Sequence, residues 1–354
     1  MLQKNCLYTR NPYFDNLKFG LILLVVIGHM SDLLKDSSFI MSVIRSGIYF
    51  FHMPLFVFVS GYFSYHEKFS IKKNFLKVIN LFGWYILFKF GLFFEHYFLL
   101  GESSSRLSLF LDGGVPWYLI ALIIWQLLIP YILLLERKKV QIVLILIGLA
   151  AGCVQSIGDY MALSRIFVFG IFFYGGMYFK QAKTPFFITI SKKYRVLAGI
   201  LLLISFFLTY ICHNYIVKLT IFSTGRYSYH ICNVNNLQGI VLRGFFLLLA
   251  VWFGVLFMCI ISPNEHIYTK WGKNTLQVYI LHTFIYVYFL NHKQFVYDIA
   301  NALQGKIILI ILSVVVTIFL SGEWISQWFK KISFIFLRIG KTLLYDLEVE
   351  EKHD

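Results

Sequence analysis

The stretch NLKFGLILLVVIGHM, residues 16–30, decides the fold class of this chain. It is almost entirely apolar, and with its neighbours it approaches the roughly 20 residues that a helix needs to cross a bilayer. Similar apolar runs recur throughout the 354 residues, of which 59% are hydrophobic and only 14% are charged. Soluble domains carry about 25% charged residues. The composition therefore predicts an all-α integral membrane protein.

We predict a bundle of about ten transmembrane helices. Their expected ranges are 17–34, 46–63, 75–100, 116–135, 140–157, 163–179, 196–212, 241–262, 275–290 and 307–328. Because no linker or second domain is visible, residues 1–345 are interpreted as one transmembrane domain and residues 346–354 as a short acidic cytoplasmic tail. The first apolar run follows polar and aromatic residues and lacks a small-residue cleavage site, so we expect a retained helix rather than a signal peptide.

The lysines and arginines are distributed unevenly over the predicted loops. With the N-terminus inside, the inner segments carry more than twice as many of the 32 basic residues as the outer segments. This asymmetry predicts cytoplasmic N- and C-termini in a multi-pass protein of the cell membrane. Anionic membrane lipids then account for the net charge of +15 without a nucleic-acid partner. The five cysteines show no metal-ligand spacing, so we expect no metal site.

The opening stretch contains two ionisable side chains, Lys18 and His29. On a helix, eleven residues bring them within about 20° of each other, roughly 16 Å apart along the axis. Asp15 lies on the same stripe and can form an ion pair with Lys18, three residues later. Ionisable groups inside a span usually face a polar cavity or the bundle interior. Two simpler interpretations stay open: Lys18 can extend to the inner surface, and His29 can be a hydrogen-bonded interhelical residue.

Other polar or aromatic side chains lie at comparable depths in the predicted bundle. His52, in the second span, lies about 9 Å from the outer helix end, close to the depth of His29. His282 lies in the middle of a span, where an ionisable residue is usually functional. Three further candidates begin predicted spans near the outer surface, where interface anchoring is the alternative role: Trp117, Tyr118 and Arg165.

Five blocks follow one another over residues 14–286: FDNLKFGLILLVVIGH, FHMPLFVFVSGYF, VPWYLIALIIWQLLIP, SRIFVFGIFFYGGMYFK and WGKNTLQVYILHTFIY. Together they resemble the membrane acyltransferase-3 family, in particular its branch of fucose acetylases and polysaccharide O-acetyltransferases. The resemblance implies transfer of an acyl group, usually acetyl, from acyl-CoA to a hydroxyl of a cell-surface glycan or its lipid-linked precursor. Acetyl-CoA would be a donor substrate, and no bound cofactor is expected.

The family's first-helix signature is a basic residue and a histidine with ten residues between them, which here are Lys18 and His29. Lysine stands where arginine is common, and it lacks the bidentate guanidinium fork. An imidazole can remove the proton from a sugar hydroxyl, so His29 is the predicted general base or, alternatively, a transient acyl carrier. Asp15 and Lys18 are assigned to the same catalytic group. Lys77 is expected to hold CoA phosphates with Lys18, unless it is only a solvated loop lysine.

We interpret the remaining candidates as substrate-binding residues: His52, Trp117, Tyr118, Arg165 and His282. A different class of protein, a polytopic glycan transporter, flippase or polymerase, would use such groups for binding without acyl transfer. Surface glycans distinguish the two classes. Loss of an acyltransferase removes an ester and leaves the sugar chain, whereas loss of a transporter or polymerase reduces the amount or length of the chain.

Overall fold

The computed structural model describes residues 10–102, 106–112, 114–181 and 186–350, and these residues form helices without a β-strand. The helices are α1 (Pro12–Asp32), α2 (Phe39–Ser64), α3 (Ile71–Phe94), α4 (Trp117–Ile132), α5 (Arg137–Ala150), α6 (Leu163–Gln181), α7 (Phe186–Thr189), α8 (Lys192–Ile211), α9 (His213–Leu219), α10 (Asn236–Ile260), α11 (Thr275–Asn291), α12 (Lys293–Ile299), α13 (Leu303–Leu320) and α14 (Glu323–Glu350). Short 3-10 or π segments occupy Glu95–Leu99, Ala151–Cys153, Thr220–Thr224 and Ile267–Lys273.

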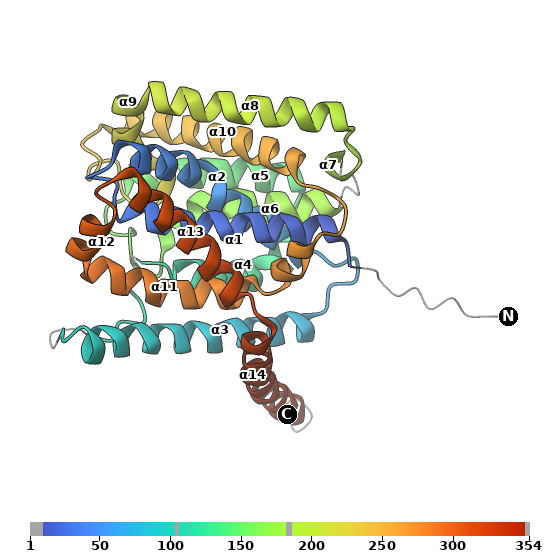
Figure 1. Cartoon of the computed structure of the whole chain (residues 1–354). Coiled ribbons are helices and arrows are strands. Elements are labelled where there is room, and N and C mark those ends of the chain that lie inside the picture. The colour runs from blue at the N-terminus through green and yellow to red at the C-terminus, as the bar shows by residue number, and fades with distance from the viewer. Residues whose placement is uncertain (1–9, 103–105, 113, 182–185, 351–354) are drawn as a thin grey trace.

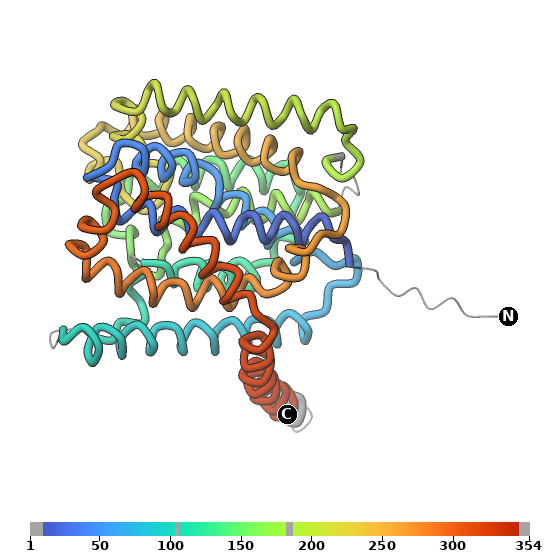
Figure 2. The backbone as a smooth tube through the Cα atoms, viewed as in Figure 1, coloured from blue at the N-terminus to red at the C-terminus, as the bar shows by residue number. Residues whose placement is uncertain are grey.

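Most of the long helices run alongside one another, with α8 along one edge of the bundle and α3 along the opposite edge (Figure 1). α1 passes through the interior (Figure 2), and its Leu17, Leu21 and Val26 are fully buried. α8 instead exposes apolar residues such as Leu203, which is 72% exposed. A bundle embedded in lipid carries apolar side chains on its outside as well as its inside, because its surroundings are apolar. Its helices satisfy their own backbone hydrogen bonds.

The prediction of an all-α membrane bundle is confirmed. Each of the ten predicted spans overlaps a helix, and within the described ranges six helices are long and apolar enough to cross a membrane: α1, α2, α3 with its π-helical extension to Leu99, α8, α10 and α13. α5 has 14 residues, so it is only about 21 Å long against a hydrocarbon core of roughly 30 Å. The number of crossings and the orientation of the termini stay predictions.

The predicted span 307–328 is wrong at its C-terminal end, because α13 ends at Leu320 and a separate helix, α14, starts at Glu323. Side-chain amides of α11 and its N-cap stabilise the break by hydrogen-bonding the carbonyls at the end of α13. Gln277 donates to the Leu320 carbonyl at 2.7 Å, and Asn274 donates to the Ser321 carbonyl at 2.9 Å. α14 then crosses the direction of the other helices (Figure 1). It continues to Glu350, so much of the predicted tail is helical; residues 351–354 lie outside the described part of the chain.

Two glycines bring α2 and α6 into direct backbone contact. A Cβ on Gly61 would lie 1.8 Å from the Phe173 carbonyl oxygen, and one on Gly176 would lie 2.0 Å from the Phe58 carbonyl oxygen. Small residues allow such close approach of helices in membranes. This contact fixes the position of α6, which carries Arg165, against α2, which carries His52.

Capping residues set where the helices of the site begin. The Asn11 side chain accepts a hydrogen bond from the Tyr13 amide at 3.0 Å, and Pro12 occupies the first turn of α1. Ser38 caps α2 by accepting from the Met41 amide at 3.4 Å. Both arrangements are favourable helix starts. They place His29 in the last turn of α1 and Arg45 in the first half of α2.

Candidate functional site

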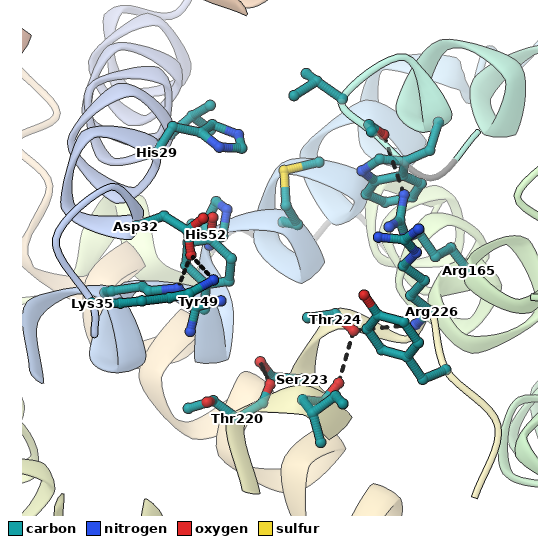
Figure 3. Close-up of a pocket in the computed structure, with 18 of the residues that line it drawn as sticks. His29, Asp32, Lys35, Tyr49, His52, Arg165, Thr220, Ser223, Thr224 and Arg226 are labelled. Atoms are coloured by element: carbon teal, nitrogen blue, oxygen red, sulfur yellow. Dashed lines mark hydrogen bonds and ion pairs between the residues drawn. The ribbon is translucent and has the colours of Figure 1, made fainter. Parts of the chain in front are cut away.

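A cavity of about 510 Å³ lies at the end of the bundle opposite to the start of α1. The end of α1 and the first half of α2 form one wall, with His29, Asp32, Tyr49 and His52. The beginning of α6 and the connection after α9 form the other wall (Figure 3). The cavity thus brings His29, His52, Trp117 and Arg165 together, four residues singled out from the sequence.

His29 is surrounded by aromatic and imidazole rings from α11 and α2. Its ring centroid lies 4.8 Å from that of Tyr286 and 5.3 Å from that of His282, and 6.4 Å from that of Tyr49. Tyr49 in turn lies 5.0 Å from His52. Three histidines from three different helices therefore cluster around the inner wall of the cavity.

Backbone carbonyls determine the tautomers of two of these histidines. His52 Nδ1 lies 2.8 Å from the Ile48 carbonyl oxygen, and His282 Nδ1 lies 2.8 Å from the Val278 carbonyl oxygen. Because a carbonyl oxygen only accepts, each Nδ1 carries the proton and each Nε2 presents a lone pair. Among the described residues, neither His282 Nε2 nor His29 Nδ1 has a hydrogen-bond partner, although both atoms are buried. Buried polar atoms normally have partners, so these two nitrogens on neighbouring rings are the unusual feature of the site.

Asp32 joins the end of α1 to α2 and α11. It forms ion pairs with Arg45 and, at 3.3 Å, with Lys35, and the Tyr286 hydroxyl donates to its Oδ2 at 3.0 Å. The Arg45 guanidinium also lies 4.3 Å from the Tyr49 ring centroid. Asp32 therefore fixes the rings that surround His29 without accepting a hydrogen bond from His29 itself.

The opposite wall carries two arginines. Arg165, only 7% exposed, lies 5.2 Å from the Trp117 ring centroid and donates to the carbonyls of Asp112 and Gly114 at 3.3 and 3.4 Å. Arg226 forms a two-hydrogen-bond ion pair with Asp159 at 2.6 and 2.5 Å. Hydrogen bonding to the Asp159 carboxylate raises the pKa of Arg226 above its ordinary value. Figure 3 shows both arginines across the cavity from His29.

Three predicted substrate-binding residues do not line the cavity: Tyr118, His282 and Lys77, of which Lys77 lies at the other end of the bundle. The Tyr118 hydroxyl shares a 2.5 Å hydrogen bond with Ser60, and its ring packs 5.3 Å from that of Tyr279. His282 is fully buried behind His29. The structure thus gives Tyr118 a packing position between helices and His282 a position next to the candidate base, rather than positions on the cavity surface.

Asp15 and Lys18 lie at the other end of α1. Their ion pair is present at 2.8 Å, and Arg10 adds two hydrogen bonds to Asp15 at 2.6 and 2.8 Å. Asp15 is only 2% exposed. Eleven helical residues, about 16 Å, separate Lys18 from His29, as the sequence predicted, so the ion pair does not contact His29 and the catalytic assignment of Asp15 and Lys18 stays a prediction. Asp15 and Lys18 form a separate ionic site.

Several cations gather around Phe63 at this end of the bundle. Lys18 lies 5.2 Å and Lys180 lies 5.8 Å from the Phe63 ring centroid. Lys77 donates to the Ser64 hydroxyl at 3.1 Å. Burial and the nearby charges of Lys180 and Lys77 lower the pKa of His66, in the loop after α2. The predicted pair Lys18 and Lys77 therefore belongs to a wider basic cluster that includes Lys180.

The sequence pattern of the acyltransferase-3 family, described as an acyltransferase domain, matches residues 11–322. The chain belongs to this family. The match covers α1 to α13 and so includes both the cavity and the basic cluster. No curated protein and no solved structure shows significant similarity to the chain. Family membership supports acyltransferase activity in a multi-pass membrane protein.

The sequence interpretation of this acyltransferase missed Asp32, Tyr286 and Arg226. Asp32 could have been found, because it continues the stripe of Lys18 and His29 by three residues. Tyr286 lies four residues after His282 and therefore on the same helix face. Arg226 offered no such signal, because its partner Asp159 is 67 residues away in the sequence.

Proposed function

We propose that this protein transfers an acyl group, acetyl in the simplest case, from acyl-CoA to a hydroxyl group of a cell-surface glycan or its lipid-linked precursor. The observation that carries this proposal is the position of His29 on the wall of a cavity of about 510 Å³, within a chain of the acyltransferase-3 family. A cavity of this volume falls in the range used by small-molecule ligands.

His29 acts as the general base in this proposal. Its Nδ1 is buried, so Nε2 is the nitrogen available to the cavity. As the hydroxyl oxygen attacks the thioester carbonyl, Nε2 removes the hydroxyl proton. The C–S bond then breaks, and CoA leaves as a thiolate. This thiolate takes up, from the imidazolium, the proton that the sugar hydroxyl lost. Arg165 supplies hydrogen-bond donors on the facing wall for an oxygen of the sugar or of the thioester.

His282 positions His29 in this mechanism. Two imidazoles joined by an N–H···N hydrogen bond of about 2.9 Å have ring centroids roughly 5 Å apart, close to the observed 5.3 Å. Since the lone pair of His282 is on Nε2, that nitrogen can accept a hydrogen bond from the Nδ1–H of His29. Such a bond leaves the lone pair of His29 on Nε2, where the base must act.

The basic cluster at the other end of α1 is the proposed binding site for the phosphates of CoA. Lys18, Lys77 and Lys180 supply point charges there, and Asp15 orients Lys18 through their ion pair. The acyl-pantetheine arm then extends roughly 16 Å along α1 to reach His29. Donor and acceptor thus approach the reacting atoms from opposite ends of the bundle.

The test is His29→Gln, whose amide keeps a hydrogen bond and similar bulk but cannot act as a base at neutral pH. We expect surface glycans to lose their O-acyl esters while retaining normal amount and chain length, because losing a general base costs about 10²- to 10⁴-fold in rate. The control is His292→Gln, at an exposed histidine of the segment after α11. Normal esterification by the His29 variant at normal expression refutes the general-base role of His29. A reduced amount of glycan with its esters intact supports a transporter or polymerase instead.

A further inference from the structure

The C-terminal helix α14 does not follow the bundle. It begins where α13 ends, beside the start of α11, and crosses α3 (Figure 1). Trp84 of α3 stacks on Phe329 at 4.1 Å and donates to the Ser333 hydroxyl at 2.9 Å. A Cβ on Gly340 would lie 3.0 Å from Leu76. One face of α14 is therefore packed against α3, toward the end of the bundle where α1 begins.

A second face of α14 is apolar but exposed. At about 100° per residue, four large side chains fall on one stripe beside the packed face, each at least 50% exposed: Trp324, Trp328, Ile335 and Ile339. An exposed stripe of this size needs an apolar environment. Tryptophan is also the residue enriched where hydrocarbon meets headgroups.

The third face of α14 is basic. Lys330, Lys331, Arg338 and Lys341 are all exposed and lie on the arc opposite the packed face, an arc that also carries the exposed aromatic side chains of Phe334 and Tyr345. Glu323, at the start of this arc, pairs with Lys330 at 2.7 Å. Lys331 lies 4.9 Å from the Trp328 ring centroid, at the boundary between the basic and the exposed apolar faces. After Asp346 the sequence becomes acidic, so the basic face ends before the chain does.

We propose that α14 is an interfacial helix that binds anionic phospholipids of the leaflet at the α1 N-terminal end of the bundle. The exposed stripe enters the acyl-chain region, and the four cations contact phosphate groups of the lipid headgroups. A helix that lies flat, with an apolar face below and cations above, is the arrangement typical of membrane-surface helices. Charge complementarity selects anionic over zwitterionic lipid.

The depth of α14 is tested on the full-length protein with its native cysteines replaced and one spin label attached, at Ile335→Cys or at Gln327→Cys on the basic arc. In vesicles of phosphatidylcholine and phosphatidylglycerol, we expect molecular oxygen to reach the label at position 335 and a water-soluble nickel chelate to reach that at position 327. Leu203→Cys on α8 is the lipid-facing reference. If the nickel chelate reaches the label at position 335 as readily as that at position 327, α14 lies in water. If neither oxygen nor the nickel chelate reaches position 335, protein covers this face. Either result overturns the proposal.

The headgroup contact is tested with a fluorophore at Gln327→Cys and brominated lipids. We expect brominated phosphatidylglycerol to quench several-fold more than brominated phosphatidylcholine, since each cation near an anionic surface contributes about fivefold in binding. The preference should disappear when all four cations are replaced (Lys330→Gln, Lys331→Gln, Arg338→Gln, Lys341→Gln) or in high salt. Lys138→Gln with Lys139→Gln, in α5, is the control. Equal preference in the parent and the four-cation variant refutes the headgroup contact.

Discussion

Replacing His282 with leucine tests whether this buried histidine positions the candidate base. His282 is fully buried, and leucine fills similar space without an acceptor for His29 Nδ1. A protonated Nδ1 would then be buried without a partner, which costs about 1–3 kcal/mol. His29 would avoid that cost by moving its proton to Nε2, the atom that must accept the hydroxyl proton.

The expected loss follows from that penalty. Since about 1.4 kcal/mol corresponds to a tenfold change, His282→Leu should lower the maximal rate of acyl transfer by roughly 5- to 150-fold. KM for acyl-CoA should change little, because the donor phosphates bind at the other end of α1. The assay is the initial rate at which labelled acetate passes from acetyl-CoA to glycan in isolated membranes.

Two further variants separate positioning from simple packing. In His282→Gln, the amide oxygen can accept from His29 Nδ1, so most of the activity should return. His292→Leu removes a histidine with the same 2.8 Å contact to a backbone carbonyl, but an exposed one that does not line the cavity, and should behave as the parent protein. Full activity of His282→Leu, or equal loss in the leucine and glutamine variants, refutes the positioning role.

The remaining predictions concern the donor site, the packing and the topology. Lys18→Arg should keep activity, because charge is retained and the guanidinium binds phosphate at least as well, whereas Lys18→Ala should raise KM for acyl-CoA; an unchanged KM reduces Lys18 to an anchor. Gly61→Ala should destabilise the protein in detergent melting assays, because its Cβ meets the α6 backbone, whereas Gly175→Ala, with no atom within 4 Å, should not. An impermeant thiol reagent should label Asn235→Cys but not Lys192→Cys in intact cells; the reverse pattern overturns the N-in orientation.

The sequence was sufficient to predict the helical bundle because lipid imposes the pattern directly. A span must be apolar over about 20 residues, and the apolar runs of this chain mark their helices accordingly. The error at residues 307–328 arose because the predicted span ran on through SGEWISQW, residues 321–328, whose Trp324, Ile325 and Trp328 belong to α14 and lie beyond the polar break at Ser321 and Gly322. What distinguishes α14 is its periodicity, with tryptophans and cations on different faces, and a simple average of hydropathy does not record this difference.

The candidate site was predictable only where its residues share one helix. The stripe through Asp15, Lys18 and His29 follows from helical geometry, and its continuation to Asp32 needed only one more step. The contact between His29 and His282 joins residues 253 positions apart. It depends on how α11 packs against α1, and no local pattern encodes that packing.

The two charged ends of α1 explain why a neutral histidine, rather than a carboxylate, is the partner proposed for His29. Asp15 is bound to Arg10 and Lys18 and lies about 16 Å from the cavity. Asp32 is near, but its oxygens already serve Arg45, Lys35 and Tyr286. Of the ionisable groups around His29, His282 is the one whose ring carries a buried nitrogen without a described partner. A neutral acceptor orients the base without adding charge to the apolar interior, where an unpaired carboxylate would be costly.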